Sequence, residues 1–315
     1  MEDLHLLPQI RDSFSHLYVE HAKIDRHEKS IAIHDLTGFT PVPAASITVL
    51  MLGPGTNITQ SAITTLADNN CLVIWCGEEN VRFYASGMGG TRSAAHVLKQ
   101  ARLVSNEQSR LEVVKNMYRM RFTDSPDDML SVEQLRGMEG VRVREAYARL
   151  SKEYGVEWNG RNYDRSNWAN SDPVNRALSC ANSCLYGVCH AAILAAGFSP
   201  ALGFIHTGKQ LSFVYDIADL YKVEIAVPLS FKIAKDPPSN LERAVRYACR
   251  DAFRDQKLLQ RIVPDIKRVL GEKGSEEQQD FAPDSDPALP TELWTPESEL
   301  AAKRWEDASE DQGGD

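Results

Sequence analysis

The chain has 315 residues, of which 43% are apolar and 25% charged, a composition typical of a globular protein and long enough for two domains. The first residues, MEDLHLLPQIRDSF, carry charges where a signal peptide is apolar. The longest apolar stretch, 184–194, is too short to cross a bilayer. These features argue against the secreted and membrane-embedded classes, and we expect a cytoplasmic protein.

The net charge of −9 is spread unevenly along the chain. Residues 275–315 contain thirteen acidic residues against Lys303 and Arg304, a net charge of −11, so residues 1–274 carry +2. This tail, rich in Pro, Asp, Glu and Ser, is predicted to be disordered. The total charge therefore does not exclude a nucleic-acid partner, although binding phosphate would depend on clustered cations.

Residues 1–86 alternate between apolar and polar positions with the period of two that is typical of strands. The turn segments LTGF, GPGTN and GEEN separate these runs, and Thr59 is a good N-cap for one short helix through Ala67. We predict a β-sandwich-like domain with strands in the runs HLYVEHAKID, SIAIHD, ITVLML, CLVIWC and VRFYA.

The glycine-rich segment SGMGGT at 86–91 interrupts this pattern. Glycine adopts backbone angles that other residues resist, so the segment indicates a hinge over 87–94. A phosphate-binding loop is the alternative, but neither the dinucleotide-binding nor the P-loop spacing is present.

After the hinge the apolar period changes to that of helices. A capping box begins at Ser131, and Asp172 followed by Pro173 supplies a second helix start. The class is therefore α+β, with an all-α domain over 95–274. Its helices are predicted at 96–121, 131–154, 173–197, from 212, and at 241–253.

The six cysteines form no C-x-x-C pair. Cys180, Cys184, Cys189 and His190 invite a zinc interpretation, because positions i and i+4 share a helix face. However, Cys189 and His190 are adjacent, and adjacent side chains point about 100° apart on a helix. We expect buried free thiols in a reducing compartment instead.

The segment SFVYDIADLYK at 212–222 places Asp216 and Asp219 at i and i+3 of a helix. On spacing alone this is more often a solvated acidic face than a metal site. The preceding loop carries His206 and Lys209 and is short enough to fold back against the start of that helix. With Lys222, these side chains make a candidate site within a short stretch of sequence.

A second candidate segment surrounds Glu139, with Arg136 and Arg142 three residues before and after it. Gly137 and Gly140 each cost the helix about 1 kcal/mol relative to alanine, which suggests that something approaches the backbone closely beside Glu139. An ordinary helix surface with Glu139 paired to its arginines is the alternative that composition leaves open.

Several long blocks, in the same order, resemble the CRISPR adaptation integrase family, and in particular its type I-E branch. They are YASGMGGTRS, SVEQLRG, LRGMEG, EYGVEWNGRNYD, SCLYGVCHAAILAAG, GFIHTGK and LSFVYDIADLYK. The resemblance covers nearly the whole of residues 1–274, and the acidic tail does not match.

The resemblance implies that Glu139, His206 and Asp219 ligate a divalent metal and that Asp216 supports the site, where we expect it to position charge or water. Carboxylates with one imidazole suit Mg²⁺ or Mn²⁺. Such a metal polarises a phosphoryl oxygen and orients a 3′-hydroxyl. The implied reaction joins short DNA fragments to a CRISPR repeat, with Lys209 and Lys222 holding phosphate. The implied assembly contains homodimers and a small second CRISPR-associated protein.

Basic and aromatic side chains outside this site are candidates for DNA contact. Arg243, Arg246 and Arg250 share a helix face in the predicted pattern, and for each of the basic residues local ion pairing is the alternative. Trp158, Tyr163 and Trp168 are suited either to stacking on bases or to anchoring a loop, and resemblance favours base contacts for the last two. The remaining basic candidates are Arg82, Lys99, Arg102, Arg136, Arg142 and Arg161.

The chain departs from the family pattern at one early strand. Family members place there a tyrosine that caps the duplex end, whereas this sequence has His21, with Tyr18 three residues earlier.

Two other functions fit the same residues. One is a structure-selective, metal-dependent nuclease that uses water in place of the 3′-hydroxyl. The other is a DNA-binding scaffold with a partner-docking acidic tail, which predicts that Glu139, His206 and Asp219 lie far apart.

Overall fold

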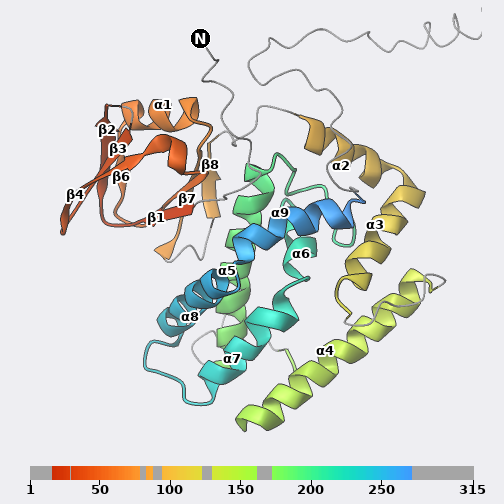
Figure 1. The fold of residues 1–315 in the computed structure, drawn as a ribbon. Coiled ribbons are helices and arrows are strands. Elements are labelled where there is room, and N and C mark those ends of the chain that lie inside the picture. The colour runs from red at the N-terminus through yellow and green to blue at the C-terminus, as the bar shows by residue number, and fades with distance from the viewer. Residues whose placement is uncertain are drawn as a thin grey trace, which may run out of the picture. The chain divides into compact units, whose positions relative to one another are not determined.

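The structure is a computed structural model, which describes residues 16–28, 30–78, 83–87, 94–122, 130–161 and 172–271. Within these residues the strands all precede position 87, and helices α2 to α9 all follow position 94 (Figure 1). The division into strands and then helices confirms the predicted α+β class. Most of the predicted hinge and all of the acidic tail lie outside the described residues.

The first of two four-stranded sheets has the order β1-β5-β7-β8. In β5, Leu50 and Leu52 belong to one apolar cluster, and Val49 and Met51 belong to another. Because successive side chains of a strand point to opposite faces, both faces of this strand are covered, which explains its uninterrupted apolar sequence. The first three strands are parallel and β8 is antiparallel: β1 (His16–Val19), β5 (Val49–Leu52), β7 (Leu72–Cys76) and β8 (Phe83–Ser86).

The second sheet has the order β4-β3-β2-β6. Its residues Ile24, Ile31 and Ile33 share one core with Leu50 and Leu52 of the first sheet, which confirms the sandwich-like arrangement. The short helix α1 (Gln60–Asp68) packs into the same core and is capped by Thr59, as predicted. The strands are β2 (Lys23–His27), β3 (Ser30–Asp35), β4 (Gly38–Pro43) and β6 (Asn57–Ile58), and a short 3-10 turn, η1 (Ala44–Ser46), follows β4.

The predicted run HLYVEHAKID is in fact two strands, β1 and β2, which belong to different sheets. Two further strands were not predicted, because turn residues conceal them. β4 contains Pro41 and Pro43 and begins at the glycine of the LTGF segment. It lies at the edge of its sheet, where a proline that cannot donate a hydrogen bond is tolerated. β6 consists of Asn57 and Ile58 alone, directly after the glycine-rich turn.

The helix predicted over 96–121 is in fact two helices, α2 (Ala95–Ser105) and α3 (Glu107–Arg119). They are separated by Asn106, which has an extended backbone and whose side chain accepts a hydrogen bond from the Ser109 N–H. Asparagine is among the best N-cap residues, so it ends one helix and begins the next while the apolar periodicity continues across both.

Helix α4 (Val132–Tyr154) begins with the predicted capping box between Ser131 and Gln134. Helix α5 (Pro173–Ala195) begins with Asp172 as N-cap and Pro173 in its first turn. Both helix starts therefore confirm the sequence prediction.

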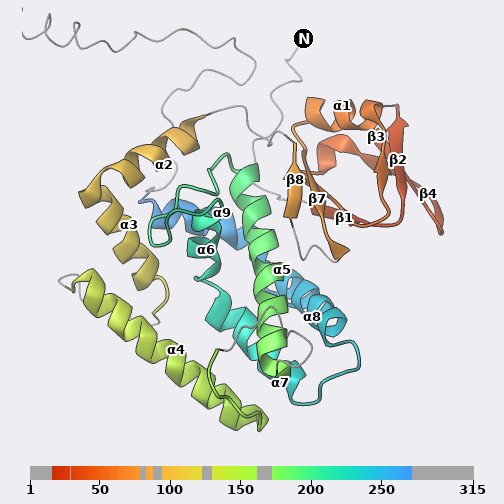
Figure 2. The ribbon, with the colours of Figure 1, turned by 180° about the vertical axis from the view of Figure 1, so that it is seen from behind.

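The C-terminal helices surround α5 in both views (Figures 1 and 2). The predicted α6 and α8 are present, whereas η4, α7 and α9 were not predicted. The π-helical turn η4 leads directly into α7, and α9 contains Pro264. The bounds are α6 (Ser212–Ala218), η4 (Lys222–Ala226), α7 (Val227–Ala234), α8 (Leu241–Asp255) and α9 (Leu258–Val269).

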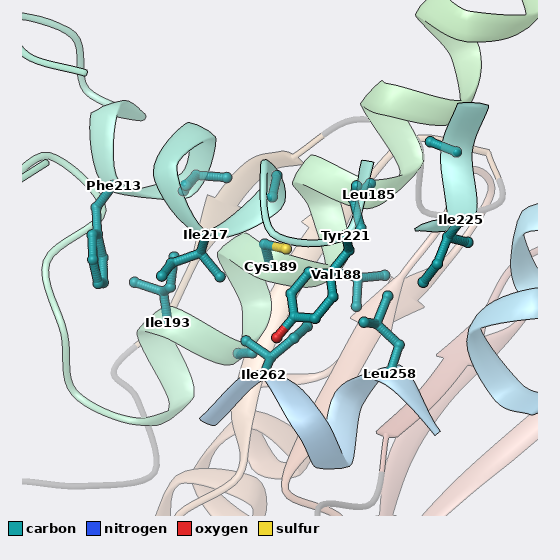
Figure 3. Packing of buried hydrophobic residues seen from close by; sticks show 14 of the residues in the cluster. Leu185, Val188, Cys189, Ile193, Phe213, Ile217, Tyr221, Ile225, Leu258 and Ile262 are labelled. Atoms are coloured by element: carbon teal, nitrogen blue, oxygen red, sulfur yellow. The ribbon is translucent and has the colours of Figure 1, made fainter. Parts of the chain in front are cut away.

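The helical core is built on α5, whose Leu185 and Cys189 pack with Ile217 of α6 and Ile262 of α9 (Figure 3). By length and composition α5 would also suffice to cross a membrane, but 72% of its most apolar 18-residue window is buried. Such burial is typical of the central helix of a helical core. All six cysteines are buried and free, as expected, and burial raises the pKa of Cys71 and Cys76 to about 12.

Small residues of α5 bring it onto the first sheet. Ala191 and Ala195 pack with Val49, Met51 and Ile74. The centre of the neighbouring His190 ring lies 3.8 Å from the centre of the Phe83 ring. Burial lowers the pKa of His190 to about 4. The helix that organises the helical half therefore also covers the outer face of this sheet.

We expect Leu185→Ala to lower the free energy of unfolding by about 2–5 kcal/mol, because it empties a fully buried position at the centre of this core. Leu98→Ala, which removes the same atoms from a 57% exposed side chain, should change it by less than about 0.5 kcal/mol. Urea unfolding followed by circular dichroism measures both. Equal losses for the two variants would contradict the assignment of α5 as the core helix.

Candidate active site

The loop before α6 folds back onto the helix, as the sequence predicted. Gly203 makes this possible, because a Cβ at this position would lie 2.2 Å from the His206 carbonyl oxygen and 2.7 Å from the Ser212 Cβ. Any side chain larger than hydrogen would push the loop away from α6. The glycine therefore sets how closely His206 approaches the helix.

Asp216 holds this loop with both carboxylate oxygens. Its Oδ2 accepts the backbone N–H groups of Phe204 and Ile205, at 2.6 and 3.1 Å. Its Oδ1 accepts the backbone N–H of His206 at 2.9 Å and lies 2.7 Å from the His206 Nδ1. The side chain is fully buried, so Asp216 does not share a solvated face with Asp219, contrary to the helical spacing. It cannot position water from there, and its contacts make it the support of His206.

The imidazole of His206 is fixed at one nitrogen and available at the other. With Nδ1 donating to the Asp216 carboxylate, the Nε2 lone pair is directed away from it, the arrangement that second-shell carboxylates impose on metal-binding histidines. The side chain is 43% exposed. The Asp216 hydrogen bond raises the pKa of His206, burial opposes this, and the negative charge of Asp219 adds to the rise.

Two side chains that sequence reasoning missed hold the same loop from the other side. Gln100 of α2 is fully buried, and its amide exchanges hydrogen bonds with both backbone groups of Ser199 and donates to the Leu202 carbonyl. Arg110 of α3 donates twice to the Phe204 carbonyl, at 2.8 and 3.0 Å. In the sequence, the one signal for this role is a polar residue on the apolar side of a helix, and Gln100 provides that signal in α2.

Asp219 follows α6 as its C-cap and is paired with Lys222, one turn later. The Lys222 Nζ lies 2.5 Å from Asp219 Oδ1 and 4.9 Å from the centre of the Tyr186 ring. Burial is the largest single influence and disfavours the charged amine, but Asp219 and Tyr186 together outweigh it and raise the pKa of Lys222. Tyr186 in turn packs against Tyr215, whose ring also contacts His206, so two unpredicted tyrosines line the site.

Glu139 lies on α4, where Arg142 binds it with two parallel hydrogen bonds of 2.8 and 2.9 Å. The local pairing that the sequence left open is therefore present. Nothing lies within 4 Å of a Cβ built on Gly137, and at Gly140 only the end of Arg144 does. No part of the described chain thus makes the close approach that these glycines led us to expect, and the backbone beside Glu139 is open.

One guanidinium joins the two acidic positions. Arg121 Nη1 lies 3.7 Å from Glu139 Oε1, and its Nη2 lies 3.8 Å from Asp219 Oδ2. Glu139 and Asp219 are 80 positions apart in the sequence and on different helices. The scaffold hypothesis predicted that they would be far apart, and this shared arginine is evidence against it.

The donor set suits a divalent cation by its chemistry, since two carboxylates and an imidazole Nε2 are ligands of Mg²⁺ and Mn²⁺. Among the residues that the structure describes, however, no three His, Cys, Asp or Glu side chains are gathered as they would be around a metal. The carboxylates are instead neutralised by Arg121, Arg142 and Lys222. The donors therefore suit such a cation by their chemistry, while Arg142 and Lys222 occupy the carboxylate oxygens in this structure.

The predicted basic face of α8 is divided. Arg243 and Arg250 are exposed, and their guanidinium groups lie 5.4 and 5.1 Å from the ring of Tyr247. Arg250 also pairs with Asp251 at 3.1 Å, so the local ion pairing that the sequence left open is present there. Arg246 points elsewhere: its side chain is 13% exposed and donates to Glu78 at 2.8 Å. The expectation that all three point outward is therefore wrong for Arg246.

Arg161 and Trp158 are anchored to the protein. Arg161 donates to Asn175 and to Ser179 Oγ on α5. Trp158 stacks on Tyr147 at 4.6 Å, which favours the anchoring alternative for this residue.

The other predicted contacts are more open or lie outside the described residues. Arg102, Arg136 and Lys209 are exposed, and Lys99 is half-buried. Arg82, Tyr163 and Trp168 lie outside the described residues. Of the two duplex-capping candidates, Tyr18 is half-buried and donates to Glu20, and His21 is exposed.

Asp216→Asn should lower the pKa of His206, because the hydrogen bond from Nδ1 to a carboxylate is the main cause of its rise. Because the pKa of His206 is higher in the folded than in the unfolded chain, its protonation stabilises the fold at pH values below the unfolded-state pKa of about 6.5. This stabilisation disappears as the pH rises through the folded-state pKa, and the variant should lack it. Titration of the imidazole by NMR checks the prediction. An unchanged midpoint would show that Asp216 does not control His206.

The family model for CRISPR associated protein Cas1 matches residues 16–126 and 119–236. CRISPR-associated endonuclease Cas1 2 of Thermus thermophilus is 52% identical over 294 residues, covering 93% of this chain and 90% of that protein. CRISPR-associated endonuclease Cas1 of Escherichia coli is 47% identical over 262 residues, covering 83% and 86%.

A crystal structure described as a TtCas1-DNA complex is similar to this chain with a TM-score of 0.75 and 54% identity, covering 84% of this chain and 99% of that one. Both the sequence and the fold are thus matched over most of their length. The chain belongs to the CRISPR-associated Cas1 family, in its type I-E-like branch.

Proposed function

We propose that this chain is a divalent-metal-dependent DNA integrase that joins short DNA fragments to a CRISPR repeat. The observation that carries the proposal is the placement of Glu139 and Asp219 on either side of one guanidinium, with His206 held near Asp219 by Asp216. The names of the relatives, which are endonucleases, and the DNA complex of a similar structure support action on DNA.

Glu139, Asp219 and the Nε2 of His206 would hold the metal, Mg²⁺ or Mn²⁺, which when bound would polarise a phosphoryl oxygen and neutralise developing charge. Asp216 keeps the imidazole in the tautomer that leaves Nε2 unprotonated. Arg142 and Lys222, which are 30% and 24% exposed, are positioned to exchange their carboxylate partners for phosphate oxygens.

The proposed reaction exchanges one phosphodiester for another. The fragment's 3′-oxygen forms a new bond to phosphorus as the bond to the repeat's own 3′-oxygen breaks, and the proton of the attacking hydroxyl ends on the leaving oxygen. One phosphodiester is made for each one broken, so no nucleoside triphosphate is needed. The lack of a P-loop sequence agrees with this.

DNA would reach the site across the exposed face of α4. Gly137 and Gly140 leave the backbone open there, and Met138 and Val141 are 42% and 45% exposed. On α8, the Arg243–Tyr247–Arg250 group presents two guanidinium groups around an aromatic ring, a combination suited to phosphate and base contacts.

We further propose that the enzyme works in the cytoplasm as a homodimer with a small second CRISPR-associated protein. The acidic residues 275–315 are a candidate docking segment for that partner. Retention of the complex after deletion of the chain beyond Gly274 would exclude this role for the tail.

A nuclease without joining activity is the second candidate, and the word endonuclease in the relatives' names favours it. It would use the same residues, with water in place of the 3′-hydroxyl. A joining assay separates the two. Short duplexes with free 3′-hydroxyls are incubated with a repeat-containing plasmid and the small partner, in magnesium, manganese or EDTA.

Asp219→Ala and His206→Ala should each reduce strand joining by at least about a hundredfold while leaving DNA binding nearly intact, because they remove ligands and not the DNA-binding surface. Glu153→Ala, an exposed carboxylate on α4, serves as the control. Metal-dependent cutting without joining would support the nuclease. Full joining by Asp219→Ala would overturn the proposed site.

Arg243→Ala and Arg250→Ala should each weaken DNA binding and reduce the slope of log K against log salt by about one, because each removes a phosphate contact. Arg268→Ala, which removes a 69% exposed arginine of α9, a helix with no part in the proposed DNA contacts, is the matched control. Binding is measured by fluorescence anisotropy over a range of salt concentrations. An unchanged slope in both α8 variants would place the DNA elsewhere.

A further inference from the structure

Arg121 differs from the other cations of the site in its burial. Its side chain is only 5% exposed, and its guanidinium lies 5.1 Å from the centre of the Tyr118 ring. Its Nε and Nη2 atoms are buried and have no hydrogen-bond partner. Since the guanidinium cannot lose its proton, the charge remains in this enclosed position.

The two carboxylates are what stabilise that charge. At 3.7 and 3.8 Å, Glu139 and Asp219 are too far for hydrogen bonds but close enough for strong attraction in a poorly solvated place. A buried cation without such compensation would be strongly destabilising. Equally, Glu139 and Asp219 would repel each other across the space between α4 and α6 if the arginine were removed.

Arg142 and Lys222 are of a different kind. Each is bound to a single carboxylate and is partly exposed, so each can turn toward solvent or phosphate. Arg121 has no such freedom, because its side chain is enclosed and each end of its guanidinium faces one of the two acids. It therefore stays beside the carboxylates whatever else binds to them.

We propose that Arg121 is a fixed internal counterion, a positioning residue that stands in for the divalent cation between Glu139 and Asp219. It keeps the two carboxylates assembled in the metal-free protein, and its positive charge lowers the affinity of the site for metal until DNA phosphates supply negative charge. This inference rests on the proposed function, since it assigns a competitor to the proposed metal site.

The test compares Mn²⁺ binding by the full chain without DNA, measured by titration calorimetry and by the electron paramagnetic resonance signal of free Mn²⁺. Arg121→Gln should bind Mn²⁺ about tenfold more tightly than wild type, because a nearby positive charge is removed. Arg121→Lys keeps the charge and should bind as wild type does. Arg176→Gln is the control, because it breaks an ion pair with Glu242 away from the site, in which both side chains are 26% exposed. It should also bind Mn²⁺ as wild type does.

A second measurement, the melting temperature, tests the role of Arg121 in the metal-free protein. It remains informative if Arg121→Gln folds poorly. In EDTA, Arg121→Gln should lower the melting temperature more than Arg176→Gln does. Combining Arg121→Gln with Glu139→Gln should recover part of the loss, because the buried charge and its partner leave together. Mn²⁺ should raise the melting temperature of Arg121→Gln more than that of wild type.

If wild type binds Mn²⁺ and Arg121→Gln binds it no more tightly than wild type does, the inference is overturned while the proposed metal site stands. Additive losses in the double variant do the same. If wild type and every variant bind no Mn²⁺, the proposed metal site itself fails, and the competition with it.

Discussion

A carboxylate with no exposure to water, that of Asp216, accepts three consecutive backbone N–H groups and the Nδ1 hydrogen of His206. A buried charge is tolerated only when its hydrogen-bonding capacity is met, and here the loop that meets it is the loop that carries the imidazole. Gly203 lets that loop approach, and Gln100 and Arg110 bind its carbonyls. The position of His206 thus follows from satisfying one buried ion.

The rest of the site is governed by charge balance. Glu139 and Asp219 come from different helices, and like charges brought together need cations between them. Arg142 and Lys222 supply exchangeable cations at the exposed side, whereas Arg121 supplies a fixed, enclosed one. Under the proposed function, a site arranged in this way would be assembled before metal or DNA binds, and it would favour binding the two together.

The helical frame makes these contacts possible because α5 is apolar on almost every side. It packs against α6 and α9 in the core (Figure 3). It also packs against the first sheet through Ala191 and Ala195. Its N-terminal part binds Arg161, and its middle part presents Tyr186 to Lys222. The same helix, α5, therefore forms the centre of the core and contributes side chains that contact residues of the site.

The sequence by itself determined the α+β class and the capped starts of α4 and α5, because periodicity and capping are local. It also supplied the candidate residues of the proposed site, because the family blocks that carry them are contiguous. It did not reveal β4, whose prolines are tolerated only at a sheet edge, or the break at Asn106, where periodicity continues across two helices. Nor did it predict that Asp216 is buried, that Arg246 turns to Glu78, or that Arg121 joins Glu139 to Asp219. These features depend on contacts between segments far apart in the chain, which only the tertiary structure brings within reach.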